Sequence, residues 1–268
     1  SGASLIVNAE GKEENIKEFL LKIVNNPPKL SRIEKVDIVQ KATDGYKDFV
    51  IERSNNVDNS FRFISPDVSS CSECVKEVLD VNSRWFSYPF TNCTHCGPRY
   101  SIIEAFPYDR SNTTMKSFKM CEDCQKDYRD PMNRRFHAQP TCCPKCGPSL
   151  SLLNQQGEEC KKGNEIKVVI REIKKGRIIA VKGLGGFHLV CNGEDEAAIT
   201  LLRKRKHRPH KPLAIMAKDI EAIKEICHIS QFEECILEGN KRPILLLDKR
   251  ESFLLPYEIA PDTKKVGV

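Results

Sequence analysis

The chain has 268 residues, of which 40% are hydrophobic and 30% are charged. This length suits two or three domains, and the composition excludes a largely disordered protein. No apolar run approaches the roughly 18 residues that span a bilayer. The first residues lack a basic stretch followed by an apolar one, so we expect no secretory signal.

Charge and cysteine content narrow the class of protein further. The formal net charge is +6 and there are 13 cysteines. Without an export signal, so many thiols predict a reducing, cytoplasmic compartment and metal binding in place of disulfides. Residues 66–150 carry 11 Lys and Arg against 10 Asp and Glu, and this near neutrality argues against nucleic acid as a partner of that region.

Residues 1–54 are predicted to form part of a ferredoxin-like α/β sandwich. Residues 5–10 read as a strand, and apolar residues over 16–24 follow at helical spacing until a pair of prolines ends the helix. Residues 32–41 and 46–53 read as two further strands. The order β-α-β-β is the later part of a split βαβ sandwich, whose first strand and first helix we do not find.

A polar linker is predicted over residues 54–70, and from residue 160 the pattern becomes α/β. Apolar stripes over 166–173 and 198–202 predict helices, and Asp219 is expected to cap a short helix that ends at Ile226. The apolar runs predict strands over 177–182, 187–191, 212–217 and 242–249.

Between these parts, one cysteine motif occurs twice. CSECVKEVLDVNSRWFSYPFTNCTHCGP begins at residue 71 and CEDCQKDYRDPMNRRFHAQPTCCPKCGP at residue 121, and each reads C-x₂-C, 18 residues, C-x₂-C. Four thiolates fill the tetrahedron of a structural zinc and leave no position for a catalytic water. We therefore predict two structural Zn²⁺ ions, bound sequentially by Cys71, Cys74, Cys93 and Cys96 and by Cys121, Cys124, Cys143 and Cys146.

Other uses of these thiols stay open at this point. Ligands could interleave between the repeats, disulfides are the ordinary alternative, and iron–sulfur ligation usually has other spacings. His95 and His137 are expected to have surface or packing roles. The cysteines outside the pairs are predicted to be inert core thiols, and they are Cys142, Cys160, Cys191, Cys227 and Cys235.

The segment RKRKHRPHK, residues 203–211, places six Lys and Arg at a predicted helix end. Such a cluster could hold a polyphosphate, although a solvated helix end that complements the helix dipole would look the same. The glycine-rich turn that starts at Gly183 could let backbone N–H groups approach a ligand, or it could be a plain turn. No G-x-x-x-x-G-K-[ST] occurs, which excludes a P-loop.

From Cys71 to Cys146, the spacing C-x₂-C-x₁₈-C-x₂-C-x₂₄-C-x₂-C-x₁₈-C-x₂-C resembles the double zinc module of the hydrogenase maturation carbamoyltransferases, the HypF family. The stretches FTNCTHCGPRYSII, RFHAQPTCCPKCGP, KGLGGFHLVC and KHRPHKPLAIM are also similar to that family. The resemblance implies a multidomain α+β fold. Its domains would be a partial acylphosphatase-like domain over 1–54, a tandem four-cysteine zinc-finger-like domain over 66–153 and an incomplete YrdC-like nucleotide-binding domain over 160–268.

The resemblance also implies an activity. Such enzymes form carbamoyl-adenylate from carbamoyl phosphate and ATP, with Mg²⁺, and pass the carbamoyl group to the C-terminal cysteine of a HypE-type maturation protein. The family's phosphate-binding motif matches Lys206, Arg208 and Lys211, and further candidates are Arg205, Lys182, Gly185 and Gly186. We transfer no catalytic residue, because the acylphosphatase loop has no counterpart here, and we expect the chain to be a fragment.

Two other functions remain as alternatives. A zinc-finger regulator that binds nucleic acid would use the basic run over 203–211, but the neutral cysteine region argues against it. A threonylcarbamoyl-adenylate synthase would follow from a YrdC-like domain alone, and the zinc module argues against that.

Overall fold

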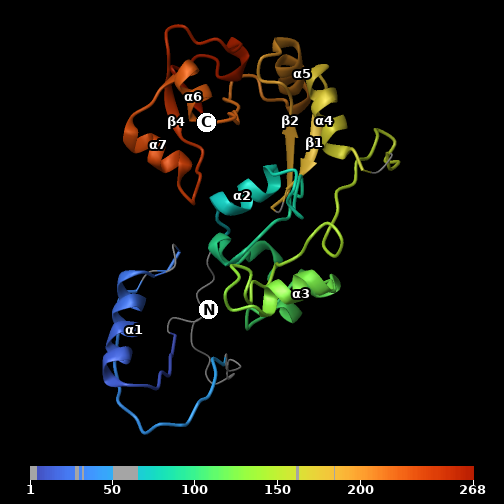
Figure 1. Cartoon of the computed structure of the whole chain (residues 1–268). Helices are drawn as coiled ribbons and strands as arrows, with labels where there is room; N and C mark the ends of the chain where they lie inside the picture. Colours follow the sequence, from blue (N-terminus) through green and yellow to red (C-terminus); the bar gives the residue numbers. More distant parts are fainter. Residues whose placement is uncertain (1–4, 28–29, 32, 51–65, 161–162, 184) are drawn as a thin grey trace. The chain divides into compact units, whose positions relative to one another are not determined.

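The computed structural model describes residues 5–27, 30–31, 33–50, 66–160, 163–183 and 185–268 (Figure 1). These residues fall into two compact units, Ser1–Pro148 and Ser149–Val268. Helices and short antiparallel strands occur together with the tandem cysteine modules, which confirms the predicted α+β class. No helix in the described residues has the length and apolar character that a membrane crossing needs.

The N-terminal segment contains one helix and, among its described residues, no strand. Helix α1 spans Glu13–Asn25 and ends just before the prolines, as predicted. The strands expected over 5–10, 33–41 and 46–50 are wrong, because these residues form neither helix nor strand. Strand hydrogen bonds need a partner chain segment, and here the apolar side chains stay in solvent, with Leu5 87% exposed. Residue 32 and residues 51–53, which belong to the second and third predicted strands, and residues 54–65 of the linker lie outside the described residues.

The two cysteine repeats fold in the same way. Each begins with an eight-residue helix, α2 over Ser72–Leu79 and α3 over Glu122–Arg129. The remaining elements are short 3-10 helices, η1 over Thr94–Cys96, η2 over Tyr100–Ile102, η3 over Arg110–Asn112 and η4 over Thr114–Ser117. No strand forms between residues 66 and 148, all of which the structure describes. This region therefore has little regular backbone hydrogen bonding to hold it.

Trp85, the single tryptophan of the chain, joins the two repeats. The guanidinium carbons of Arg84 and Arg135 lie 4.2 Å and 3.5 Å from the centroid of its ring. Its Nε1 donates a 2.8 Å hydrogen bond to the carbonyl of Cys142 in the other repeat. Trp85 and Cys142 belong to one buried cluster with Tyr88 and Met115. The repeats are thus packed against each other as one body.

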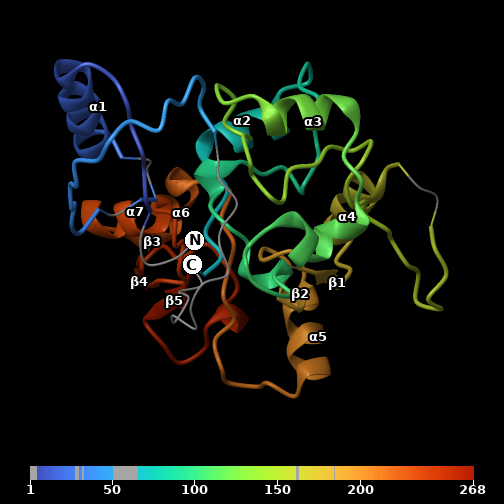
Figure 2. The same cartoon turned by 90° about the horizontal axis from the view of Figure 1, so that it is seen from below.

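The second unit is built from α4 to α7 and two small antiparallel sheets. Helix α4 spans Glu165–Lys174 and precedes the hairpin of β1, Ile179–Lys182, and β2, Phe187–Val190. Helix α5 covers Glu196–Lys206, α6 covers Ile220–Ile226 and α7 covers Gln231–Glu238. Figure 2 shows the second sheet, in which β4, Leu246–Lys249, lies between β3, Cys227–His228, and β5, Lys265–Gly267. A 3-10 helix, η5, spans Tyr257–Ile259.

The predictions for this unit were mostly confirmed. Helices occur over the stripes at 166–173 and 198–202, and the side chain of Asp219 accepts the N–H of Ala222 as the N-cap of α6. The strand expected over 212–217 is wrong, because only an isolated bridge joins Ala214 to Gly267. Its amides alternate between two distant partners, Ile259 and Gly267, so no continuous ladder forms.

An aliphatic core holds the second unit together. The buried cluster contains residues from α5, α6, β3, β4, η5 and β5, and its larger members are Ile199, Ile223, Leu247, Ile259 and Val266. The hairpin β1–β2 contributes little to it, since seven of its eight residues are exposed.

Candidate functional site: two tetrathiolate centres and a basic loop

The first thiol cluster is built by α2 and η1. Cys71 is the N-cap of α2 and Cys74 lies one turn later, which places both thiols on one side of the helix. Cys93 and Cys96 bracket η1 in the same way. The Sγ–Sγ distances are 3.5 Å for Cys71–Cys93, 3.6 Å for Cys74–Cys96 and 3.9 Å for Cys93–Cys96.

The second cluster repeats this geometry with Cys121, Cys124, Cys143 and Cys146. Its Sγ–Sγ distances are 3.7 Å for Cys121–Cys143, 3.7 Å for Cys143–Cys146 and 3.6 Å for Cys124–Cys146. In both clusters all four thiols lie within 4.8 Å of one another. Each group comes from a single repeat, so the structure groups the ligands sequentially and does not interleave them.

These distances fit a metal ion and exclude disulfides. A disulfide has its sulfurs about 2.05 Å apart, and all 13 cysteines are free. Four sulfurs bound at about 2.3 Å to one zinc in a tetrahedron lie about 3.8 Å from one another. Both clusters are close to that spacing. They are two four-cysteine sites that could hold structural metal.

The electrostatics of the thiols also call for a cation. Hydrogen bonds with Cys93 and Cys96, together with burial, raise the pKa of Cys74 far above its ordinary value. At the second site burial acts against ionisation of Cys146, but backbone N–H groups lower its pKa to about 7. Four crowded thiols cannot all ionise without a positive charge between them, and a metal ion supplies that charge.

The other sulfur and imidazole groups near the sites are not ligands. His95 is exposed, and the ring of His137 packs 4.9 Å from that of Tyr128, which confirms the expected surface and packing roles. Cys142 is buried beside the second site, where its Sγ lies 3.5 Å from the hydroxyl of Tyr88. The expectation of core thiols holds for Cys142 and Cys227 but is wrong for Cys235, which is exposed on α7.

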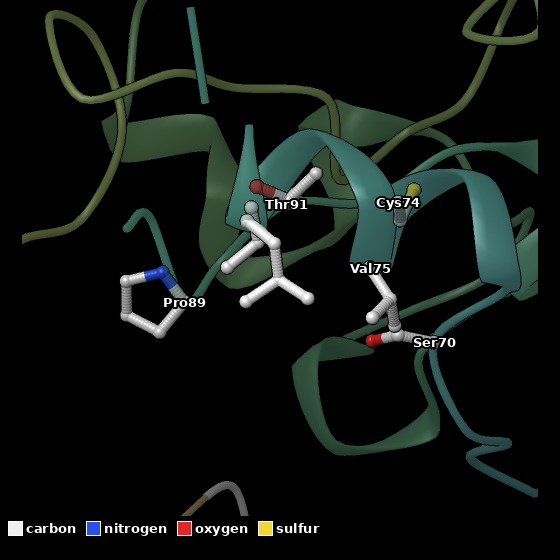
Figure 3. Close-up of a pocket in the computed structure, with 7 residues that line it drawn as sticks. Ser70, Cys74, Val75, Pro89 and Thr91 are labelled. Carbon is white, nitrogen blue, oxygen red and sulfur yellow. The ribbon is translucent and has the colours of Figure 1, made fainter. Parts of the chain in front are cut away.

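A shallow hollow of about 200 Å³ lies beside α2 (Figure 3). Its lining includes the apolar side chains of Val75 and Pro89 together with Ser70, Cys74 and Thr91. Its thiol, Cys74, already belongs to a cluster of four cysteines, and the hydroxyl of Thr91 donates to the carbonyl of Tyr88 at 2.8 Å.

The predicted phosphate-binding residues lie at the end of α5 and in the loop after it. Lys206 is the last residue of the helix, and His207 in the left-handed conformation turns the chain away. The side chains of Arg205, Lys206 and Lys211 are exposed. Arg208 folds back onto its own loop, because its Nη2 donates to the carbonyl of Pro212 at 2.8 Å and its Nε to that of Lys211 at 3.3 Å.

Sequence reasoning missed the residue that organises this loop, Arg203. Its side chain is only 7% exposed. Its guanidinium donates to five backbone carbonyls, those of Arg208, Pro209, Lys211, Glu258 and Ile259. Arg203 therefore ties the basic loop to η5. Arg203 follows Ile199 by four residues and therefore lies on the apolar face of the helix. This spacing was the one signal in the sequence that could have distinguished it from its exposed neighbours.

The remaining candidates lie in the turn between β1 and β2. The amide of Gly183 donates to the carbonyl of Gly186 at 2.8 Å, and Gly186 has φ of 149°, a conformation that favours glycine. The Nζ of Lys182 lies 5.8 Å from the ring centroid of Phe187. Gly185 is exposed in the same turn, and Leu184 lies outside the described residues. Among the described residues, no hydrogen bond or ion pair joins this turn to the basic loop.

Comparison with known protein families identifies two parts of the chain. Residues 71–103 and 120–153 match the profile of the family described as "HypF finger". Residues 171–268 match the Sua5, YciO and YrdC family, described as "Telomere recombination". These matches cover the repeats with both thiol clusters and the unit with the basic loop.

Curated proteins and solved structures of one kind resemble the whole chain. Carbamoyltransferase HypF of Synechocystis sp. is 46% identical over 268 residues, all of this chain and 35% of that protein. The protein of that name from Rhizobium leguminosarum is 43% identical over 99% of this chain and 33% of its own length. The chain thus spans about a third of the length of the curated relatives it matches.

Two solved structures share the fold of the chain. Full-length HypF in a phosphate- and nucleotide-bound form has a TM-score of 0.88 and 44% identity, over 96% of this chain and 34% of that one. HypF of T. kodakarensis has a TM-score of 0.87 and 43% identity, over 97% of this chain and 33% of that one.

Proposed function

Because this chain belongs to the HypF carbamoyltransferase family, we propose that it acts in a carbamoyltransferase reaction of nickel–iron hydrogenase maturation. The overall reaction uses carbamoyl phosphate and ATP, the latter as its Mg²⁺ complex. Water cleaves carbamoyl phosphate to carbamate and phosphate. An oxygen of the carbamate then attacks the α-phosphorus of ATP, and the bond between the α-phosphorus and the bridging oxygen breaks as pyrophosphate leaves. The products are carbamoyl-adenylate, phosphate and pyrophosphate.

In the second step the activated group moves to a protein. The thiolate of a C-terminal cysteine on a HypE-type partner attacks the carbamoyl carbon, and AMP leaves with the electrons of the broken C–O bond. A thiocarbamate on the partner results. Both steps are expected in the cytoplasm, with no membrane and no nucleic acid taking part.

The basic loop is the part of this chain that we assign to the first step. Negative charge builds up on the phosphates as pyrophosphate leaves, and cations stabilise it. The exposed ammonium groups of Lys206 and Lys211 are the first candidates, with Arg205 beside them. Arg208 has two N–H groups engaged within the loop, so we assign it both to shaping the loop and to phosphate. Lys182, Gly185 and Gly186 are proposed to contact the nucleotide from the hairpin.

The observation that carries this assignment is the set of hydrogen bonds from the buried guanidinium of Arg203 to the loop. Three carbonyls of the loop point to one guanidinium, at 2.7 to 3.1 Å. With its carbonyls turned inward, the loop is held in one shape while the lysine side chains extend into solvent. A preorganised cluster of cations is what polyphosphate binding requires.

The cysteine repeats are proposed to be a scaffold that holds two zinc ions. Zinc bound by four cysteines supplies a rigid cross-link and no catalytic water. We assign residues 66–153 to this domain, residues 1–54 to a partial acylphosphatase-like domain and residues 160–268 to an incomplete YrdC-like nucleotide-binding domain.

The test is carbamoyl-phosphate-dependent exchange of labelled pyrophosphate into ATP. It should be run with this chain and with a form extended to the length of the relatives. We expect exchange in the extended form, loss of at least about tenfold on joint Lys206→Ala and Arg208→Ala substitution, and little change on Lys204→Ala, which alters an exposed lysine of the same helix. Exchange that required threonine in place of carbamoyl phosphate would favour threonylcarbamoyl-adenylate synthesis. No exchange in a folded, zinc-loaded extended form would contradict the proposal.

A further inference from the structure

Each cysteine repeat places one arginine against an acidic residue of the other repeat. Arg84 of the first repeat forms an ion pair with Asp127 on α3, in the second repeat. Arg134, fifty residues later, forms one with Glu77 on α2, in the first repeat. Each arginine therefore lies near the thiol cluster of the other repeat. This reciprocal arrangement follows from the duplication, because Arg84 and Arg134 occupy equivalent positions, as do Glu77 and Asp127.

The two arginines differ in how they meet the thiols. The Nη1 of Arg134 lies 3.3 Å from the Sγ of Cys74 and 3.9 Å from that of Cys71. A guanidinium stays protonated in proteins, so Arg134 places a positive charge beside these two sulfurs. The hydrogen bond that the structure gives Arg84 goes to Asp127, and its Nη1 lies 3.9 Å from Asp123. Arg84 therefore acts on the thiols of the second site by the electrostatic field of its charge, without a hydrogen bond to a sulfur among the described residues.

The backbone of Arg134 adds a second contact with the first site. Its carbonyl accepts hydrogen bonds from the amide of Thr94 at 3.0 Å and from the hydroxyl of Thr94 at 2.9 Å. Thr94 lies between Cys93 and Cys96, so Arg134 contacts both halves of the first cluster. In the second repeat the equivalent residue is Pro144, which has neither an N–H nor a hydroxyl to donate.

These contacts bear on metal retention. Four thiolates around one divalent zinc carry a net charge of about −2. A guanidinium that donates to a bound sulfur offsets this charge and makes the sulfur a weaker nucleophile, and groups of this kind commonly change metal affinity by about 10–100-fold. The same argument applies to any thiophilic divalent ion, and it does not depend on the carbamoyltransferase activity.

We propose that Arg134 makes the Cys71–Cys96 site the slowly exchanging one of the two, so that metal leaves the Cys121–Cys146 site first. Retention at the first site then depends on a residue of the second repeat. Loss of order in the second repeat would remove Arg134 from Cys74 and loosen the first metal. The two sites would therefore empty in sequence, and the order would be second site, then first.

The experiment uses the whole chain loaded with two zinc ions and a chromogenic chelator in excess. Release is followed by absorbance, and the freed thiols are identified by pulsed alkylation with N-ethylmaleimide and mass spectrometry. We expect two phases, with Cys121, Cys124, Cys143 and Cys146 alkylated in the fast one. Arg134→Gln should accelerate the slow phase by at least about tenfold. The matched Arg84→Gln variant should leave the slow phase within about threefold of the unsubstituted chain.

Two further variants separate a local effect from general unfolding. Arg134→Lys keeps the charge but loses the fork of N–H groups, and should fall between the unsubstituted chain and Arg134→Gln. Thr94→Pro copies the second repeat and should accelerate the slow phase alone. The proposal is overturned if the first site empties first or at the same rate, or if Arg134→Gln and Arg84→Gln behave alike. A chain that takes up no zinc would overturn the metal sites and this proposal together, whatever the pyrophosphate exchange shows.

Discussion

The cysteine repeats and the second unit are ordered by different interactions. In residues 66–148, the side chains buried most completely are those of two threonines and six cysteines. In the second unit the largest of them are aliphatic, namely Ile199, Leu247, Ile259 and Val266, and Cys227 and Ala260 are buried as completely. The first region has short helices and no strand, whereas the second has two sheets. One chain thus gathers two sets of candidate metal ligands in one part and buries an aliphatic core in the other.

The difference shows how each part offsets the entropy of an ordered backbone. A structural zinc contributes an apparent binding free energy of about 10–16 kcal/mol, as much as the whole stability of many domains, about 5–15 kcal/mol. Two such sites can therefore order a region that has little regular structure. The second unit has only its core, in which each fully buried aliphatic side chain contributes about 1.5–3 kcal/mol. The two parts should therefore respond to different perturbations.

Breaking one metal site should have the largest effect. We expect Cys124→Ser to lose one zinc and most of the order around Trp85, because Cys124 and Trp85 share a buried cluster. The second unit should keep its amide protection. Zinc content and the fluorescence of the single tryptophan measure the loss, and hydrogen exchange measures the protection. Cys142→Ser, at a buried thiol outside both sites, is the control and should retain two zinc ions.

A cavity in the aliphatic core should destabilise the second unit and leave both zinc sites intact. Leu247 is 1% exposed on β4, and Leu247→Ala should destabilise the second unit by about 2–5 kcal/mol. Its neighbour Leu246 is 62% exposed, so Leu246→Ala should cost less than about 0.5 kcal/mol. Urea unfolding followed by hydrogen exchange would separate the two units. A matching loss of zinc in Leu247→Ala would contradict their independence.

Removing the guanidinium that holds the basic loop should have an intermediate effect. Arg203→Ala removes a donor from five carbonyls, of which those of Lys211 and Ile259 keep another donor. We expect a loss of about 1.5–3 kcal/mol in the second unit. Exchange of the amides over 207–211 should rise further than exchange elsewhere in that unit. Lys204→Ala removes the same charge from an exposed position of the same helix and should change neither quantity. Equal exchange in both variants would mean that Arg203 does not hold the loop.

The helix caps should give the smallest effect and still distinguish the regions. The side chain of Asp219 caps α6 at 2.9 Å from the amide of Ala222, so Asp219→Ala should cost about 1 kcal/mol and Asp219→Asn much less. Helices α2 and α3 begin at the metal ligands Cys71 and Cys121, whose side chains make no cap hydrogen bond. Thermal unfolding of the zinc-loaded variants would measure the cost. A larger cost for Asp219→Asn than for Asp219→Ala would contradict the cap assignment.

The sequence alone determined the features that depend on near neighbours. The spacing of the cysteines predicted two four-cysteine clusters, because C-x₂-C places two thiols on one turn. Apolar periodicity and Asp219 predicted α4, α5 and α6, since their hydrogen bonds form within a few residues. The similarity to HypF followed from the same local motifs.

Tertiary structure alone decided which distant groups meet. Strands were predicted over 5–10, 32–41, 46–53 and 212–217, and the described residues of these ranges form none. A strand exists only where a partner supplies its hydrogen bonds. The charged run over 203–211 did not reveal that Arg203 is buried while Lys204 is exposed. Nor could the duplication show that Arg134 reaches Cys74 while Arg84 binds Asp127. These outcomes depend on packing between residues that are far apart in the chain, and no local pattern records that packing.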